Sequence, residues 1–490
     1  MVEKPQVEIT KKEFKEFSKT YNLIPIYKVI NKDNHTPVSV YKSLKNYANT
    51  FLLESVEGNK NFARYSFIGL NPNKIIKTGD KEISNQIDPL KELEKQISNI
   101  KTPKLNGLPE FNSGAVGFIS YEAVSYFEPS VKKIFDPTSY FPESIFFITS
   151  SLIIFDNQEN KIFIVSHADL RKSNNTESEY IKSLEEIKSL NSLIDNSKIT
   201  EKKVNQSQEI KLKINSLTSK EEFMESVDET KKLIYSGEMI QAVLSQKLTV
   251  EVESDAIDIF SSLRKINPSP YMFLLDCDDF KIIGSSPELL VKLQNGKTAV
   301  HPIAGTRPRG RNEKEDLENE IDLLKDEKEI SEHLMLLDLG RNDLGKIAKP
   351  GSVKVTQQME IEKYSHVMHI VSHVEADINP EFNAFDVLRS AFPAGTVSGA
   401  PKVRAMKLIS EKEKYKRGPY SGAVGYFSYD GNMDTAIAIR TIVLKDNLAI
   451  LQAGAGIVAD SDPETEHNEC LAKMGALIKA LEHAEKSKQK

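Results

Sequence analysis

The chain is poor in cysteine and carries no large excess of either charge. Its two cysteines, Cys277 and Cys470, lie far apart in unlike surroundings. They provide neither a disulfide framework nor a cysteine zinc site, and a reducing compartment fits them. The formal net charge of -6 over 490 residues argues against general attraction to nucleic acid or to a membrane surface. We therefore expect small molecules or another protein as partners.

Long apolar runs are also missing. The most apolar stretch, "SIFFITSSLIIF" at 144–155, is too short to span a bilayer, and the N-terminal "MVEKPQVEITKKEF" lacks the apolar centre of a signal peptide. These features predict a soluble, cytoplasmic protein without a membrane partner. The length allows two to four domains or one large two-lobed unit.

A polar stretch at 173–216, rich in Lys, Glu, Ser and Asn, predicts a solvated helix followed by a linker. It separates an N-terminal region, 15–172, from a C-terminal region, 217–482. In the first region, "TFLLESVEGNKNFARYSFIGL" and "SIFFITSSLIIFDNQENKIFIVSH" resemble antiparallel hairpins. In the second, Ser219 and Glu222 form a capping box that predicts a helix, and "MIQAVLSQKLTVEV" after it predicts a strand.

One segment echoes another across the chain. "SGAVGFISYE" at 113–122 and "SGAVGYFSYD" at 421–430 share seven of ten residues. Either two glycine-containing strands meet similar packing demands, or a sheet is duplicated with pseudo-symmetry. Neither interpretation indicates chemistry by itself.

Two nucleotide fingerprints fail when their surroundings are considered. "GAGIVA" at 454–459 is followed by "DSDP" instead of a helix, and "GTVSGAPK" at 395–402 has the wrong spacing for a phosphate loop. Neither class of nucleotide-binding protein is favoured.

Three histidines, His366, His369 and His373, occur in "KYSHVMHIVSHVEA". On a helix they would nearly share a face, as metal ligands do, but the β-branched content predicts a strand. On a strand, His369 and His373 share one face and His366 points the other way. A three-histidine zinc site is therefore disfavoured, which leaves one functional histidine or only structural ones.

Carboxylates are spaced for metal binding on two predicted helices. After "DSDP", Pro463 suits the first turn of a helix capped by Ser461 or Asp462. On that helix Glu466, Glu469 and Lys473 align on one face. The other interpretation of this face is a solvated surface with an ordinary ion pair.

The second helix lies in "DEKEISEHLMLLDLGRND", where Asp326 is the predicted cap. Glu329 and Glu332 stand three apart and therefore adjoin on one face. Two helices that each offer a Glu pair suit Mg²⁺, which prefers oxygen ligands and keeps several waters.

Ten ordered motifs resemble the large subunits of anthranilate synthases, within the chorismate-utilising enzyme family. They are "LLES", "NPSPYMF", "GSSPE", "PIAGTRPRG", "EHLMLLDLGRND", "YSHVMH", "GTVSGAPKVRAM", "YSGAVGYF", "IAIRT" and "QAGAGIV". The resemblance extends over about Phe51 to Lys479. It implies a two-lobed α+β fold in which antiparallel β-sheets form a sandwich flanked by helices.

The resemblance also implies an activity and a set of site residues. Chorismate and ammonia would be converted to anthranilate and pyruvate with Mg²⁺, as the first step of tryptophan biosynthesis, with feedback inhibition by L-tryptophan. The residues that match the family's catalytic positions are Glu288 as general acid, His369 in pyruvate elimination, and Thr396. The metal ligands that match are Glu332 and Glu469, with Glu329 and Glu466 holding the metal's waters. The substrate-binding matches are Gly305, Thr306, Tyr420, Arg440, Gly454, Ala455, Gly456 and Lys473. The residues that match the tryptophan site are Glu54, Ser55, Asn267, Pro270, Tyr271 and Met272.

Neither cysteine lies in a sequence suited to a glutamine-hydrolysing nucleophile. We therefore expect a separate glutamine amidotransferase subunit, hence a hetero-oligomer, with free ammonia as an alternative substrate. Ala304 stands where many aminodeoxychorismate synthases have a lysine nucleophile, and Gln241 where isochorismate synthases have a lysine base. Two alternatives stay open: an aminodeoxychorismate synthase component, and a non-catalytic tryptophan-binding regulatory subunit. The second would show erosion of the catalytic residues, and these are intact.

Overall fold

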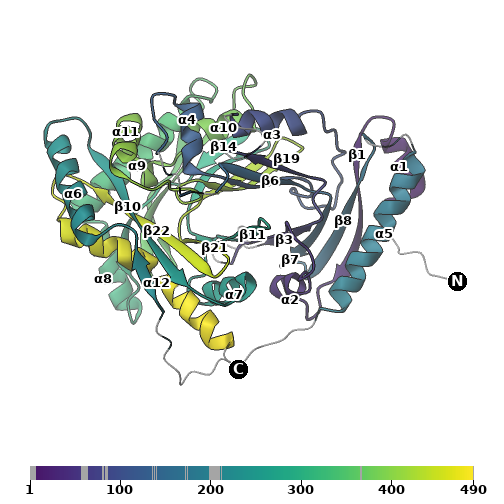
Figure 1. The fold of residues 1–490 in the computed structure, drawn as a ribbon. Helices are drawn as coiled ribbons and strands as arrows, with labels where there is room; N and C mark the ends of the chain where they lie inside the picture. Colours follow the sequence, from purple (N-terminus) through teal and green to yellow (C-terminus); the bar gives the residue numbers. More distant parts are fainter. Residues whose placement is uncertain are drawn as a thin grey trace.

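A computed structural model gives the fold (Figure 1). It describes residues 7–56, 64–79, 82, 87–134, 136, 138–139, 141–171, 173, 175–197, 210, 212–364 and 367–488. Within these ranges no helix is both long and apolar enough to cross a membrane.

Two antiparallel sheets form the body of the protein, with helices around them (Figure 1). Over the described residues the first sheet has 12 strands. In spatial order they are β1 (Leu23–Asn31), β8 (Lys161–Asp169), β7 (Ser151–Asp156), β3 (Tyr65–Leu70), β2 (Phe51–Glu54), β11 (Tyr271–Asp276), β12 (Lys281–Ser286), β21 (Thr441–Lys445), β22 (Leu448–Ile457), β10 (Gln241–Glu251) and β18 (Gly399–Ala400), with β9 (Ile214–Ser216) beside β10.

The second sheet has 10 strands in the same ranges. Their order is β15 (Ile303–Pro308), β17 (Val367–Asp377), β14 (Lys297–Val300), β13 (Leu289–Gln294), β20 (Met433–Ile437), β19 (Ala423–Ser428), β5 (Gly114–Ile119), β6 (Ser144–Ile148) and β4 (Lys74–Thr78), with β16 (Lys354–Lys363) on β17. Both sheets combine strands from before and after the polar stretch, joined where β2 pairs with β11 and where β5 pairs with β19.

The two echoing segments become neighbours in the second sheet. β5 and β19 pair antiparallel, with Gly117 directly opposite Gly425. A Cβ on Gly117 would lie 1.9 Å from the Ile145 carbonyl oxygen, and one on Gly425 would lie 2.1 Å from that of Asp434. The matching glycines therefore meet the same demand, close contact with the next strand outward on each side of the pair.

The strands in the middle of the second sheet are buried on both faces. In β5, Val116 and Phe118 pack into the core between the sheets, while Ala115 and Ile119 pack into a second core on the other face. Alternate residues of a strand point to opposite faces. Burial on both faces explains why the sequence of this region reads as a continuous apolar run.

The helices and short 3₁₀ turns surround these sheets. They are α1 (Lys11–Phe17), α2 (Pro37–Lys42), α3 (Pro89–Ile97), η1 (Tyr121–Ala123), α4 (Val124–Phe127), α5 (Thr176–Asp195), α6 (Lys220–Tyr235), α7 (Ala256–Ile266), α8 (Glu313–Leu323), α9 (Glu327–Gly345), α10 (Ala384–Ala391), η2 (Gly395–Val397), α11 (Lys402–Lys412) and α12 (Pro463–Lys488). Helix α9 packs on β15 and β17 of the second sheet, and α12 packs on β22 of the first. These two helices carry the predicted metal ligands.

The predicted local elements are confirmed where the structure describes them. In the polar stretch the predicted helix is α5, whereas most of the predicted linker lies outside the described residues and its end forms β9. The hairpin runs form β2, β3, β6, β7 and β8, and the histidine segment forms the strand β17 from Val367 onward. The capping box of Ser219 begins α6. Asp326 caps α9, and the Asp462 carboxylate accepts the Thr465 N–H at 2.9 Å at the start of α12. His366 lies outside the described residues.

Candidate active site

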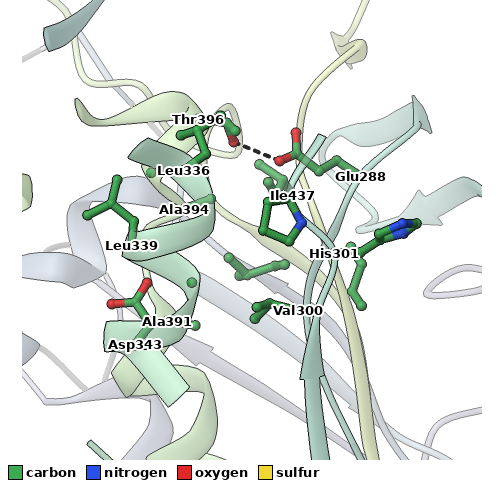
Figure 2. Close-up of a pocket in the computed structure, with 15 residues that line it drawn as sticks. Glu288, Val300, His301, Leu336, Leu339, Asp343, Ala391, Ala394, Thr396 and Ile437 are labelled. Atoms are coloured by element: carbon green, nitrogen blue, oxygen red, sulfur yellow. Dashed lines mark hydrogen bonds between the residues drawn. The ribbon is translucent and has the colours of Figure 1, made fainter. Parts of the chain in front are cut away.

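Glu288 lies in the turn between β12 and β13 and is only 8% exposed. The Thr396 hydroxyl donates a hydrogen bond of 3.0 Å to its Oε1 atom, across a small cavity of about 40 Å³ (Figure 2). Burial raises the pKa of Glu288 from 4.5 to about 8, although the Thr396 bond and the charges of Arg440 and Lys473 act in the other direction. The carboxyl therefore keeps its proton at neutral pH, as a general acid must.

Arg440 presents an unpaired cation close to this acid. Its φ of 50° puts it in the left-handed region, which non-glycine residues seldom adopt, and its carbonyl accepts the Ser285 N–H at 3.1 Å. Burial lowers its pKa, against the charges of Tyr420, Glu288 and Glu469. Among the described residues, none forms a hydrogen bond or an ion pair with its guanidinium. A half-buried guanidinium without a partner is suited to grip a carboxylate through two parallel bonds.

Two glycines of β22, Gly454 and Gly456, lie beside the site, and we call them the glycine floor. Gly454 and Gly456 lie opposite Ser245 and Val243 of β10. A Cβ on Gly454 would lie 2.8 Å from the hydroxyl oxygen of Tyr420. Burial raises the pKa of Tyr420 to about 12, so its hydroxyl remains a donor. A side chain at Gly454 would collide with this hydroxyl and with the Leu244 carbonyl oxygen of β10, so the packing requires glycine at this position.

On the neighbouring strand, Gln241 packs against Gly456, where a Cβ would lie 2.1 Å from the amide nitrogen Nε2. Ala455, between the two floor glycines, is fully buried. Lys473 of α12 donates to the Gly454 carbonyl at 2.9 Å and pairs with Glu469 at 2.6 Å. Helix α12 and the glycine strand are therefore joined at the site itself.

His369 on β17 lies opposite Thr306 of β15. Its Nδ1 atom is 3.0 Å from both the Gly305 carbonyl oxygen and the Thr306 hydroxyl. Burial lowers the pKa of His369, and the charge of Arg440 lowers it further, while the Gly305 bond has the opposite effect. Because a carbonyl oxygen only accepts, Nδ1 carries the proton and Nε2 is left as the basic atom. Gly305 has a φ of 70°, at the bulge in β15.

The carboxylates of α9 and α12 act on one another electrostatically. Burial raises the pKa of Glu332, and the charges of Glu329 and Glu469 raise it further, while Gln241, whose Nε2 lies 3.5 Å from Glu332 Oε1, opposes the shift together with Lys473. Burial and the charge of Glu469 likewise raise the pKa of Glu466.

This repulsion between oxygen ligands on two helices is what a hydrated divalent cation would relieve. The described residues contain no group of three acidic, histidine or cysteine side chains arranged to hold a metal unaided. Two direct carboxylate ligands completed by water and substrate, as Mg²⁺ prefers, fit this donor set.

The arginines that follow Thr306 hold the loop and helix in place. Arg307 donates to Asp322 at 2.7 Å, to Asp326 at 2.7 Å and to Glu329 at 3.1 Å. Its neighbour Arg309 bonds the Asp316 carboxylate and the Tyr364 carbonyl. Both have structural partners, and Arg307 also orients one of the predicted outer carboxylates.

A second, larger cavity of about 470 Å³ lies between the N-terminal strands and β11. Of the six residues predicted for tryptophan, five line it: Glu54, Ser55, Pro270, Tyr271 and Met272. Asn267 does not. It lies at the end of α7, and its side chain donates to the Ser285 hydroxyl at 3.1 Å. The Ser55 hydroxyl oxygen is buried and has no hydrogen-bond partner in the part of the chain that the structure describes, and the Arg264 guanidinium bonds Glu54 at 3.1 Å.

Sequence reasoning missed part of this cavity wall. Tyr271 donates to the Asp434 carboxylate at 3.2 Å, and Lys292 lies 3.4 Å from the other oxygen of that carboxylate. The rings of Phe111 and Tyr426 stack nearby, with centroids 4.0 Å apart. A charged residue inside the apolar strand "MDTAI" was the signal available for Asp434.

His373, the other described histidine of the predicted trio, has a structural partner. His373 pairs with Glu375 at 3.1 Å and lies edge-on to His301, with ring centroids 5.7 Å apart. Neither belongs to a metal-binding group within the described residues.

A buried acid that keeps its proton, an arginine without a partner among the described residues, and carboxylates that repel one another are a combination suited to an anionic substrate. Residues 48–479 match the chorismate binding enzyme family. A relative from Acetivibrio thermocellus named anthranilate synthase component 1 is 43% identical over 493 residues, covering 96% of this chain and 98% of its own. A second, from Aquifex aeolicus, is 43% identical over 97% of this chain and 98% of its own.

Among solved structures, anthranilate synthase component I from Streptococcus pneumoniae matches with a TM-score of 0.73 at 36% identity, covering 91% of this chain and 99% of its own. The menaquinone-specific isochorismate synthase of Escherichia coli matches in fold alone, with a TM-score of 0.70 at 18% identity over 96% of this chain and 98% of its own. The chain belongs to the chorismate binding enzyme family, in the branch of the anthranilate synthase component 1 proteins.

Proposed function

We propose that this protein is the large subunit of an anthranilate synthase, converting chorismate and ammonia to anthranilate and pyruvate. The observation that carries the proposal is Glu288, a buried carboxyl that remains protonated near neutral pH beside the unpaired guanidinium of Arg440. Ammonia adds to the ring at C2 as the C4 hydroxyl leaves, and Glu288 gives that hydroxyl its proton. Arg440 and the Tyr420 hydroxyl hold the enolpyruvyl carboxylate.

Elimination of pyruvate then needs a base for the ring proton at C2. The unprotonated Nε2 of His369 serves that role, because the Gly305 carbonyl fixes the proton on Nδ1. Thr396 orients the acid through its hydrogen bond to Glu288.

Glu332 and Glu469 would hold Mg²⁺, with Glu329 and Glu466 binding its waters. The ion would neutralise the ring carboxylate of chorismate and fix the ring against the glycine floor. The mutual repulsion of the four carboxylates supports this assignment.

The cavity of about 470 Å³ beside β11 is proposed as the site of feedback inhibition by L-tryptophan. Glu54 and the unpartnered Ser55 hydroxyl would bind the amino acid's polar groups, and Pro270, Tyr271 and Met272 would pack on the indole ring. The amino group of the product would come from glutamine through a separate amidotransferase subunit. Two observations on the cysteines support a separate subunit for glutamine hydrolysis. Both thiols are buried, and burial raises the pKa of each, whereas an activated cysteine nucleophile has a lowered pKa.

One assay tests the reaction. The purified chain is mixed with chorismate, Mg²⁺ and an ammonium salt, and anthranilate is followed by its fluorescence, with chromatography for aminodeoxychorismate. Anthranilate and pyruvate in equal amounts are expected, together with loss of the rate in chelator and in Glu288→Gln. Accumulation of aminodeoxychorismate would instead favour the aminodeoxychorismate synthase alternative, against which Ala304 already stands. Tryptophan binding without any product would indicate a regulatory subunit.

A further inference from the structure

A buried ion pair joins Arg417 to Glu413, and neither residue lines the cavity of Glu288 and Thr396. The Arg417 side chain is fully buried, and it bonds the Glu413 carboxylate through Nε at 2.8 Å and Nη2 at 2.7 Å. A buried pair of this kind gains little net stability, because removing both charges from water offsets their attraction. Stability alone therefore does not explain why the pair lies here.

The other N–H groups of Arg417 bond three separate segments. Nη1 donates to the Val397 carbonyl at 2.7 Å and to the Ser421 hydroxyl at 3.2 Å, and Nη2 donates to the Val243 carbonyl at 2.7 Å. These segments are η2, the turn before β19, and β10. The planar fork of the guanidinium fixes their relative positions, which a lysine ammonium could not do.

Each of these segments carries a residue of the proposed site or pairs with a strand that does. Val397 directly follows Thr396, which bonds the acid, and Ser421 directly follows Tyr420. Val243 lies opposite Gly456 of the glycine floor in the β10–β22 ladder.

Glu413 extends the same support to the other end of the floor. Its Oε1 atom accepts from the Ser245 N–H at 3.0 Å and from the Ser245 hydroxyl at 2.8 Å. Ser245 lies opposite Gly454 and also accepts from Gln452 at 2.8 Å. One ion pair therefore bonds the two β10 residues that lie opposite Gly454 and Gly456.

Two aromatic rings enclose the cation. The central carbon of the Arg417 guanidinium lies 4.6 Å from the ring centroid of Tyr121 and 5.6 Å from that of Tyr420. Contact between a cation and the faces of aromatic rings is attractive and restrains both partners. Tyr420 is therefore held through its neighbour Ser421 and through its own ring.

We propose that Arg417, clamped by Glu413, is a positioning residue that sets the mutual placement of Thr396, Tyr420 and the glycine floor around the substrate. This inference rests on the proposed function. Arg417 does not itself reach the substrate, since its N–H groups are bonded within the protein.

The test compares Arg417→Lys and Glu413→Gln with Arg171→Lys as the matched control. Arg171 also holds a carboxylate with two bonds, to Asp169 at 2.8 and 2.7 Å, but it follows β8 in the other part of the molecule. Steady-state kinetics with ammonia give kcat and KM for chorismate at several pH values. Thermal unfolding measures the loss of stability of each variant.

We expect Arg417→Lys to raise KM for chorismate and lower kcat, together reducing kcat/KM about 10- to 100-fold, as displacement of substrate-binding groups does. The fall in rate at alkaline pH should also move to higher pH, because the Thr396 bond that lowers the pKa of Glu288 is weakened. Glu413→Gln should change kcat/KM and the pH of the alkaline fall in the same directions but by less. Arg171→Lys should change neither quantity.

Wild-type kinetics and pH profile in Arg417→Lys, whatever its loss of stability, would mean that the pair is only structural and would overturn the inference. If Arg417→Lys does not fold, Glu413→Gln decides by the same two measurements. Failure of the wild-type chain to form anthranilate would refute the proposed function instead, so the two failures are distinguishable.

Discussion

Replacing the buried acid should make the protein more stable as it becomes inactive. In Glu288→Gln the side chain keeps its shape and an oxygen that accepts the Thr396 hydroxyl, but it never ionises. The folded wild-type chain holds the Glu288 proton up to about pH 8, whereas an unfolded chain releases it near 4.5. The folded state binds more protons in that interval, so its stability falls as the pH rises from about 4.5 to about 8.

The size of this effect follows from the same interval. At 1.36 kcal/mol per pKa unit, the wild-type chain loses at most about 5 kcal/mol relative to the glutamine variant by pH 8. At pH 4 both side chains are neutral and the two proteins should be almost equally stable. Urea unfolding of both proteins at pH 5, 7 and 9 measures the growing difference, while the anthranilate assay reports the loss of activity.

Glu327→Gln is the control, since Glu327 is an exposed residue of α9. A stability difference between wild type and Glu288→Gln that changes with pH no more than the difference for Glu327→Gln would refute the reasoning, because it would mean that Glu288 ionises alike in the folded and unfolded chains. The general-acid role would then lose its physical basis.

Three further predictions concern the other groups. Arg440→Lys keeps the charge but loses the two parallel bonds, so KM for chorismate in steady-state kinetics should rise about tenfold or more; an unchanged KM would remove Arg440 from substrate binding. Glu469→Gln should raise the Mg²⁺ concentration for half-maximal rate by at least the about 10- to 100-fold that loss of a group supporting a metal ligand typically costs, and a rate independent of added Mg²⁺ and chelator would contradict the assignment. Ser55→Ala removes a buried hydroxyl without a partner, so stability to urea should stay equal or rise by about 1 kcal/mol, whereas the tryptophan concentration for half inhibition should increase; inhibition equal to wild type would place the effector elsewhere.

Local features of the site could be predicted from the sequence because their causes are local. Cap residues and spacing located the Glu pairs of α9 and α12, and β-branched neighbours identified the strand that carries His369. The sequence of one helix could not decide whether its carboxylate face binds a metal ion or is only solvated. It depends on whether Glu332 and Glu469, 137 positions apart in the printed numbering, act on each other.

What the sequence could not supply depends on long-range pairing. The register of β11 on β12 sets Tyr271 opposite Ser286, two residues before Glu288, and no local pattern encodes that alignment. That no described residue bonds the Arg440 guanidinium is likewise a property of the assembled site. The charged neighbours of Arg417 in "KEKYKRGPY" are typical of an exposed segment, yet the Arg417 side chain is completely buried.

The sharing of both sheets between the two parts of the chain makes its fragments dependent on each other. If the chain were cut between 197 and 210, one fragment would expose the open edges of β2 and β5, and the other the open edges of β11 and β19. Edges with unpaired N–H and C=O groups associate readily with other strands. Each fragment alone should therefore aggregate. Co-expressed fragments have complementary edges and should assemble into one particle through the native strand pairs.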